Sequence, residues 1–110
     1  MCSFDTLHNA IQARIDMAEK LHGGDPLLQW EIITERFSAD IPRTIRFVLT
    51  EMSDTELYWL SEVFDELLLN TKSRELLDAL KTRTASVQDS ESRKEIADEL
   101  DEAIGVVGMF

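Results

Sequence analysis

Glu19 and His22 form an E-x-x-H pair near the end of a predicted helix, which is the clearest chemical signal in this sequence. This spacing places a carboxylate and an imidazole side by side on one helix face, as in di-metal helical bundles. Such a bundle needs a second E-x-x-H pair, and the sequence has none; His8 lies too far back along the chain. His22 also falls in the apolar sector of its helix, where a half-buried histidine is expected. We therefore predict no metal site and no cofactor.

Glu62 and Asp65 are close enough on one predicted helix to share general acid and base catalysis. No sequence feature beside them predicts a cleft or an oxyanion site. Cys2 has no neighbouring base that would activate its thiol. We predict that the protein is not an enzyme.

The helix that carries these two acids also places an aromatic side chain among carboxylates. Its predicted core side is formed by the apolar residues Leu57, Leu60, Phe64, Leu67 and Leu68. The opposite side carries the first set of candidate partner-binding residues, namely Tyr58, Glu62, Asp65, Glu66 and Leu69, with Trp59 at the border. An aromatic anchor ringed by acids is typical of a binding hot spot. In the alternative interpretation, Tyr58 or Leu69 packs beneath a neighbouring helix.

The last predicted helix carries a second acidic face. Its apolar side is formed by Ile96, Leu100, Ala103 and Ile104. Its other side supplies the second set of candidate partner-binding residues, namely Glu91, Glu95, Asp98 and Glu102, flanked by Glu99 and Asp101. In the alternative interpretation, this stripe is only a solvated surface.

No Lys or Arg occurs from Phe47 through Thr71, and this segment contains six acids: Glu51, Asp54, Glu56, Glu62, Asp65 and Glu66. Like charges four residues apart, such as Glu62 and Glu66, destabilise a helix by a few tenths of a kcal/mol. The segment cannot neutralise itself locally, so we expect a cationic partner to relieve the repulsion.

The whole chain is acidic, with 22 Asp and Glu against 11 Lys and Arg, a formal net charge of -11 and a pI near 4.4. Nucleic acids and anionic membrane surfaces would repel such a chain. We therefore expect no direct nucleic-acid partner and no membrane partner. Excess acid can also serve solubility alone.

The elements that position these residues are all predicted to be helices, because Gly and Pro are few and alternating strand patterns are missing. Helices are predicted over about residues 5–22, 25–37, 42–52, 53–70, 73–84 and 92–105, with capping boxes at Ser53/Glu56 and Ser92/Glu95. The third is expected to present Ile45, Val48 and Leu49 to the core, and the tail over residues 106–110 to cover it. The predicted fold is all-α: residues 1–110 form one domain, a compact bundle or stack of five to six short antiparallel helices.

No apolar stretch approaches the roughly 20 residues needed to span a bilayer, and the N-terminal residues lack a basic segment followed by an apolar one. A single cysteine, Cys2, cannot form an internal disulfide. We expect the protein in the cytoplasm.

Two segments are similar to small helical immunity proteins of bacterial contact-dependent growth inhibition systems. They are TEMSDTELYWLSEVFDE, which starts at Thr50, and NTKSRELL, which starts at Asn70. The similar pieces are the S-D-x-E-L helix start, the W-L-S-E-V-F core of the same helix, and the T-K-S turn that opens the next helix.

This resemblance implies a cytoplasmic protein that neutralises a toxin by tight one-to-one binding, often by covering the active site of a nuclease domain. A nuclease grips phosphates and is basic at its active site, so an acidic inhibitor would take the place of the phosphates. The expected partner is a cationic toxin domain, with a ribonuclease favoured, although non-nuclease toxins also have immunity proteins.

Two other function classes fit the composition. An acidic mimic of nucleic acid would use the same carboxylates to occupy a DNA-binding protein, over a longer surface. A self-associating scaffold would use Trp30, Trp59 and the tail over residues 106–110 as its interface. The sequence does not fix the oligomeric state.

Overall fold

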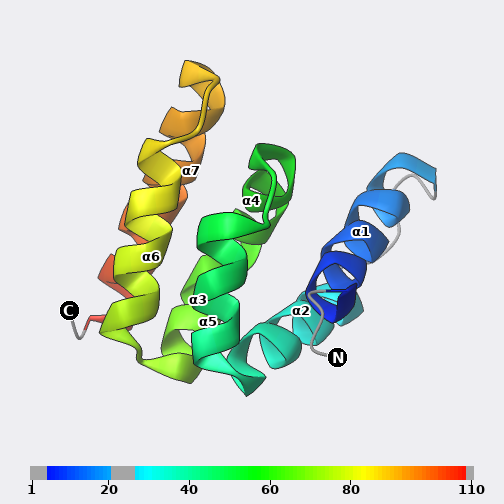
Figure 1. Cartoon of the computed structure of the whole chain (residues 1–110), viewed down its shortest axis with the longest axis horizontal. Coiled ribbons are helices and arrows are strands. Elements are labelled where there is room, and N and C mark those ends of the chain that lie inside the picture. Colours follow the sequence, from blue (N-terminus) through cyan, green and yellow to red (C-terminus); the bar gives the residue numbers. More distant parts are fainter. Residues whose placement is uncertain (1–4, 21–26, 109–110) are drawn as a thin grey trace.

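The computed structural model of the protein describes residues 5–20 and 27–108, and every regular element within those ranges is helical (Figure 1). In chain order the elements are α1 (Asp5–Lys20), α2 (Leu27–Ala39), α3 (Ile41–Thr50), α4 (Asp54–Leu60), the 3₁₀ helix η1 (Ser61–Val63), α5 (Phe64–Thr71), α6 (Arg74–Ala85) and α7 (Ser90–Val107). The prediction of an all-α fold is confirmed. Counted with α4, η1 and α5 as one interrupted helix, the described part of the chain has six helices.

Several predicted features lie outside the described residues. They include Cys2, His22, the helix-ending Gly23 and Gly24, the start signal at Asp25 and Pro26, and the last two residues of the apolar tail. Within the described part of the tail, Val107 packs against the core, whereas Val106 is 68% exposed. No described helix is long and apolar enough to cross a membrane.

The interrupted helix α4–η1–α5 is the centre of the core. All five residues of its predicted apolar side are buried: Leu57, Leu60, Phe64, Leu67 and Leu68. They join a single cluster to which every α-helix contributes. Burying a Leu or Phe side chain fully stabilises the fold by about 1.5–3 kcal/mol, so these five residues tie the central helix firmly to its neighbours.

The break in this helix was not predicted. At Val63 the backbone leaves the helical region, with φ -118° and ψ 16°, and the Ser61 hydroxyl donates a hydrogen bond to the Tyr58 carbonyl oxygen. A serine hydroxyl that competes for backbone groups disfavours a regular helix, and a β-branched residue beside it adds to that effect. The prediction of one continuous helix over residues 53–70 is therefore wrong at this point.

Helix starts were predicted well where a capping residue is present. At α4, the Ser53 side chain accepts the Glu56 N–H and the Glu56 carboxylate accepts the Ser53 N–H, which confirms the capping box. Ser73 caps α6 as expected. At α3, Asp40 caps a helix whose first turn contains Pro42, where no backbone donor is required.

The limits of the last helix differ from those predicted. Asp89 caps α7 by accepting the Ser92 N–H at 2.8 Å, so Ser92 lies inside the helix and the Ser92/Glu95 capping box is wrong. The helix also continues through Gly105 to Val107 and ends on Gly108, which has a left-handed φ of 69°. The prediction that the helix ends at Gly105 is therefore wrong, because the second glycine, Gly108, adopts the terminating conformation.

The core face of α3 was also partly mispredicted. Leu49 is 44% exposed, whereas Phe47 and Val48 are fully buried. Phe47 packs edge to face on Phe37 of α2, with ring centroids 5.7 Å apart. Phe47, which lies two residues before Leu49, thus takes the core position that was predicted for Leu49.

Short connections make α5, α6 and α7 run alternately up and down in Figure 1. The strongest pairings join α1 with α2, α3 with α6, and α5 with α7. The contacts place α5 and α7 side by side, and because both are antiparallel to α6 they run in the same direction. This parallel pairing brings together the two acidic faces of the sequence.

Candidate functional site

The two predicted acidic faces form the walls of a single groove. One wall is the α4–η1–α5 helix, with Tyr58, Glu62 and Asp65, and the other is α7, with Glu95, Asp98, Glu99 and Glu102. We call this feature the acidic groove. Its central hollow has a volume of about 550 Å³, large enough to receive several side chains of another molecule.

Three hollows follow one another along the groove. Tyr58 and Glu95 border both the first and the second, and Glu62 and Glu99 border both the second and the third. The first hollow begins at Asp54, the first residue of α4, and at Asp89, which caps α7. The third hollow ends at Val106. The groove therefore follows the two parallel helices over most of the length of α7.

Tyr58 stands at the groove with 41% of its surface exposed. Its ring meets that of the half-buried Trp59 edge to face, with centroids 5.9 Å apart. Leu69 is 50% exposed. The alternative in which Tyr58 or Leu69 packs beneath a neighbouring helix is therefore wrong.

Glu62 is not a free carboxylate. Arg14 of α1 donates two hydrogen bonds to it, from Nε and Nη2, each 3.0 Å long, and Trp30 Nε1 donates a third at 3.1 Å. The Arg14 guanidinium also lies over the Trp59 ring, 4.9 Å from its centroid. The fold thus supplies a cation to this segment from 48 residues away.

Two other acids of the segment without Lys or Arg are also paired within the chain. Asp54 binds Arg83 of α6 at 2.6 Å, and Glu56 lies 2.5 Å from His8 of α1. The prediction that a partner must neutralise the whole segment is therefore too broad. The other three acids of the segment, Glu51, Asp65 and Glu66, make no ion pair with the described residues.

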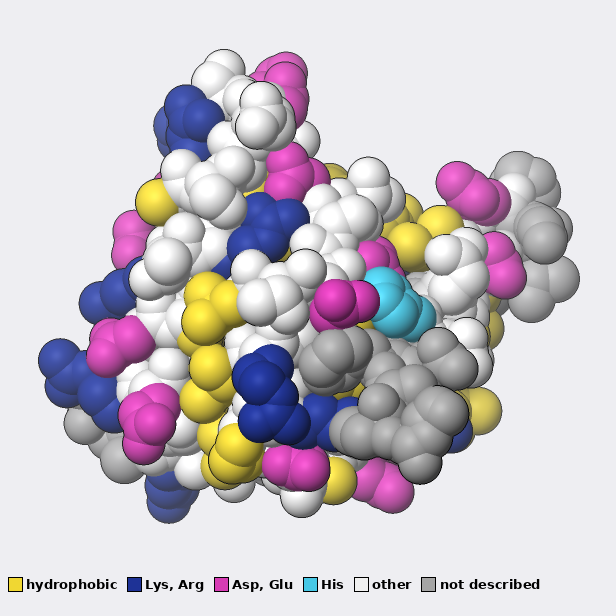
Figure 2. Space-filling view, in the orientation of Figure 1, with side chains coloured by type: hydrophobic (Ala, Val, Ile, Leu, Met, Phe, Trp, Pro, Cys, Tyr) yellow, Lys and Arg dark blue, Asp and Glu magenta, His cyan; other side chains and the backbone are white. Residues whose placement is uncertain are grey.

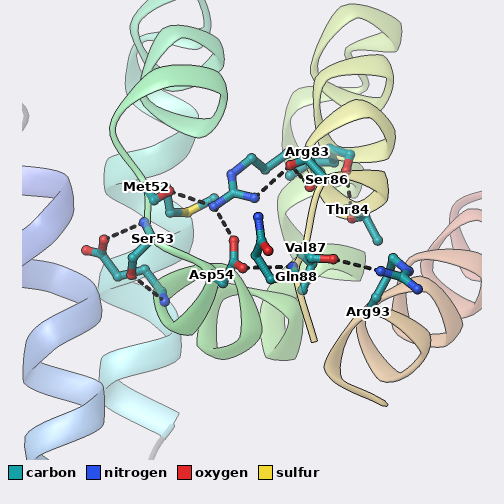
Figure 3. A network of polar contacts seen from close by, with 11 residues as sticks. Met52, Ser53, Asp54, Arg83, Thr84, Ser86, Val87, Gln88 and Arg93 are labelled. Carbon is teal, nitrogen blue, oxygen red and sulfur yellow. Dashed lines mark hydrogen bonds and ion pairs between the residues drawn. The ribbon is translucent and has the colours of Figure 1, made fainter. Parts of the chain in front are cut away.

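Asp54 closes one end of the groove through the network drawn in Figure 3. Its two carboxylate oxygens accept hydrogen bonds from Arg83 and from the backbone N–H of Gln88, and Arg83 also binds the Met52 carbonyl oxygen. The Gln88 N–H, reinforced by the Arg83 guanidinium, lowers the pKa of Asp54. This network fixes the start of α4 against the connection between α6 and α7.

Glu99 lines the groove but was only a flanking residue in the sequence prediction. Partial burial raises the pKa of its carboxyl, and the neighbouring Glu102, Asp65, Glu62 and Asp98 raise it further. Residues 95, 99 and 102 follow the helical i, i+4, i+7 spacing, which could have placed Glu99 in the same stripe. Glu99 is where acids from both walls converge.

Three predicted site residues do not line the groove. Glu66 faces another hollow, between α2 and α5, beside Glu31 and Glu35, and accepts a 3.4 Å hydrogen bond from Thr34. Leu69 is exposed one turn beyond Asp65, and Glu91 is exposed in the first turn of α7. The structure thus brings together Tyr58, Glu62, Asp65, Glu95, Asp98 and Glu102, and it adds Glu99.

Cationic side chains are concentrated elsewhere. In Figure 2, Lys and Arg lie among acidic and apolar side chains over the face formed by α3 and α6. The α3 helix carries Arg43 and Arg46 and no acid. Among the described residues, no group of three or more His, Cys, Asp or Glu could hold a metal ion.

Comparisons of this chain with protein-family models, curated proteins and solved structures gave no match.

Proposed function

We propose that this protein is an immunity protein that binds a basic toxin domain one to one and neutralises it. The observation that carries the proposal is the acidic groove, in which the exposed Tyr58 lies beside carboxylates of both walls, among them Glu95 and Glu99 of α7, which make no ion pair within the described part of the chain. The protein performs no catalysis in this proposal and acts in the cytoplasm, where the toxin would otherwise reach its target.

The composition of the groove supports a protein partner. An exposed aromatic residue beside acids resembles binding hot spots, in which Tyr fills a pocket and charge steers the approach. A nuclease domain fits best, and a ribonuclease in particular, because a site that grips phosphates presents Lys and Arg to which these carboxylates are complementary. A mimic of double-stranded nucleic acid would instead need carboxylates over a long convex surface, whereas these acids are gathered in one groove.

The first test is to capture the partner from the native cell at low salt with tagged protein, followed by mass spectrometry. The proposal predicts that one basic toxin domain is retained in equal amount, and that the captured domain loses its toxicity in the complex. Recovery of a DNA-binding regulator, or of the protein alone, would contradict the proposal.

Tyr58→Ala tests the anchor. Truncation of a hot-spot aromatic costs about 2 kcal/mol or more of binding energy, which is roughly a thirtyfold loss of affinity. Leu28→Ala is the control, because Leu28 is 61% exposed and does not line the groove. Equal affinities of the two variants, measured by calorimetry, would remove Tyr58 from the site.

A further inference from the structure

We infer that the acidic groove receives one basic amphipathic helix of the partner, laid along α7, with cationic residues at i, i+4 and i+7 and an apolar residue one turn further on. This inference rests on the proposed function and specifies what occupies its site. Three features of the groove lead to it: its shape, the spacing of its acids, and the apolar residues at one end.

The shape of the groove fits a helix. Its walls are two parallel helices, and a third helix can pack over the seam between them at the usual interaxial distance of about 8–10 Å. From Asp89 to Val106 the groove follows 17 residues of α7. At about 1.5 Å per residue this is roughly 25 Å, the length of a helix of four to five turns.

The acids have helical spacing. Within the described part of the chain, Glu95, Glu99 and Glu102 make no ion pair, while Asp98 is paired with Lys94 at 3.1 Å. Successive axial separations of the three free acids are about 6 Å and 4.5 Å, which a helix with cations at i, i+4 and i+7 reproduces. A strand would instead place side chains of one face at a uniform spacing of about 6.6 Å.

Apolar residues mark one end of the groove. Val106 lines this end of the groove, one turn beyond Glu102 on α7, and is 68% exposed. Leu69 lies outside the lining, one turn beyond Asp65 on α5, and is 50% exposed. Because the two helices are parallel, both residues are at the same end. Charge complementarity along the middle and apolar contact at this end together describe a basic amphipathic helix.

The test uses two synthetic peptides of about 18 residues with identical composition. One carries Lys at i, i+4 and i+7 and Leu one turn later, and the other has the same residues permuted so that no helical face is basic. Binding is measured by anisotropy of labelled peptide at physiological salt, and helix formation by circular dichroism. The patterned peptide should bind at least tenfold more tightly than the permuted one and become helical on binding.

Variants of the protein locate the interaction. Glu99→Gln with Glu102→Gln should abolish the preference for the patterned peptide. Glu91→Gln with Asp101→Asn should preserve it, because these changes remove the same charge from α7 outside the groove. Val106→Thr should weaken the patterned peptide severalfold, whereas Leu49→Thr, at an exposed apolar residue of α3, should not.

Equal affinity for the two peptides, a preference that survives the double Gln variant, or a bound peptide that stays non-helical would each overturn the inference. These results leave the proposed function standing if the double Gln variant still loses the captured toxin domain. If that variant binds the toxin domain as tightly as the wild type, the acidic groove is not the binding site; the proposed function itself fails only if no basic toxin domain is captured.

Discussion

At the scale of single residues, Glu62 shows how an acid that looks free in the sequence can be part of the fold. Its carboxylate holds Arg14, whose side chain is only 11% exposed, and Trp30. Removing one partner of a mostly buried ion pair leaves the other charge uncompensated. Glu62 is therefore a positioning residue of the groove, which fixes α1 and α2 against the central helix.

Glu62→Gln should lower the free energy of unfolding by about 1–3 kcal/mol, the range for charged hydrogen bonds. Glu66→Gln is the matched control on the same helix, where we expect a change within about 0.5 kcal/mol because Glu66 is exposed. Urea unfolding monitored by circular dichroism measures both. Equal effects of the two substitutions would mean that the Arg14 pair contributes little to stability.

Unlike Glu62, the charged carboxylate of Glu99 should destabilise the folded protein at neutral pH. Its pKa is raised in the folded state, so its contribution to stability is greatest below the pKa of the unfolded chain, about 4.3, and is lost as the pH rises through the folded value. At pH 7 the charged form opposes folding. Glu99→Gln should therefore stabilise the protein at pH 7 by about 0.2–0.5 kcal/mol, the size of like-charge repulsion on a helix.

The pH dependence is the control for this prediction. Below about pH 4 the wild-type carboxyl is largely protonated in both states, so the gain from Glu99→Gln should shrink toward zero. Glu91→Gln should show no comparable gain at pH 7, because Glu91 lies outside the groove in the first turn of α7, where a negative charge is favourable. A loss of stability with Glu99→Gln at pH 7 would contradict the claim that the neighbouring acids repel the charged Glu99 carboxylate.

At the scale of elements, the two glycines at the end of α7 have different roles. Gly105 lies inside the helix, and a Cβ added there meets no atom within 4 Å. Gly108 has φ +69° and donates its N–H to the Ile104 carbonyl oxygen at 3.0 Å. Only the second position requires the conformational freedom of glycine.

Gly105→Ala should therefore raise the free energy of unfolding by about 0.5–1 kcal/mol, because glycine is unfavourable inside a helix. Gly108→Ala should lower it by about 1 kcal/mol, because a Cβ is strained in the left-handed conformation. Thermal unfolding of the two variants measures both changes in stability, which should have opposite signs. A gain at Gly108 together with a loss at Gly105 would place the helix end at Gly105.

Local signals explain which elements were predictable. The Ser53/Glu56 capping box and the apolar side of the central helix depend on residues a few positions apart, and both were predicted correctly. The break at Val63 depends on a serine hydroxyl that binds its own backbone, and the start of α7 depends on a choice between Asp89 and Ser92. Such choices between competing local bonds are not visible in hydrophobic periodicity.

At the scale of the whole molecule, charge is distributed unevenly. The stretch from Asp54 to Thr71 contains five acids and no base, and α7 contains six acids and two bases. The parallel pairing of α5 and α7 places these two acidic stretches side by side, while α3 contributes only cations. The molecule is therefore strongly negative on the side of the groove, which favours association with a basic partner at low salt.

The sequence predicted two acidic faces but not that they form one groove. Periodicity assigns a residue to a face of its own helix, whereas the pairing of α5 with α7 depends on packing between distant parts of the chain. The neutralisation of Glu62 by Arg14 is likewise a long-range contact. For the same reason Glu66 and Glu91 were assigned to the site although neither lines the groove.

The most direct test of the account is the affinity of the captured basic domain for three proteins, measured by calorimetry at low and physiological salt. These are the wild type, the groove variant Glu99→Gln with Glu102→Gln, and the off-groove variant Glu91→Gln with Asp101→Asn. The account predicts that only the groove variant loses at least about tenfold in affinity, and that salt weakens the wild type more than the groove variant, since exposed charges are screened over about 8 Å. Equal losses in both double variants, or an affinity indifferent to salt, would contradict the assignment of the acidic groove as the binding site.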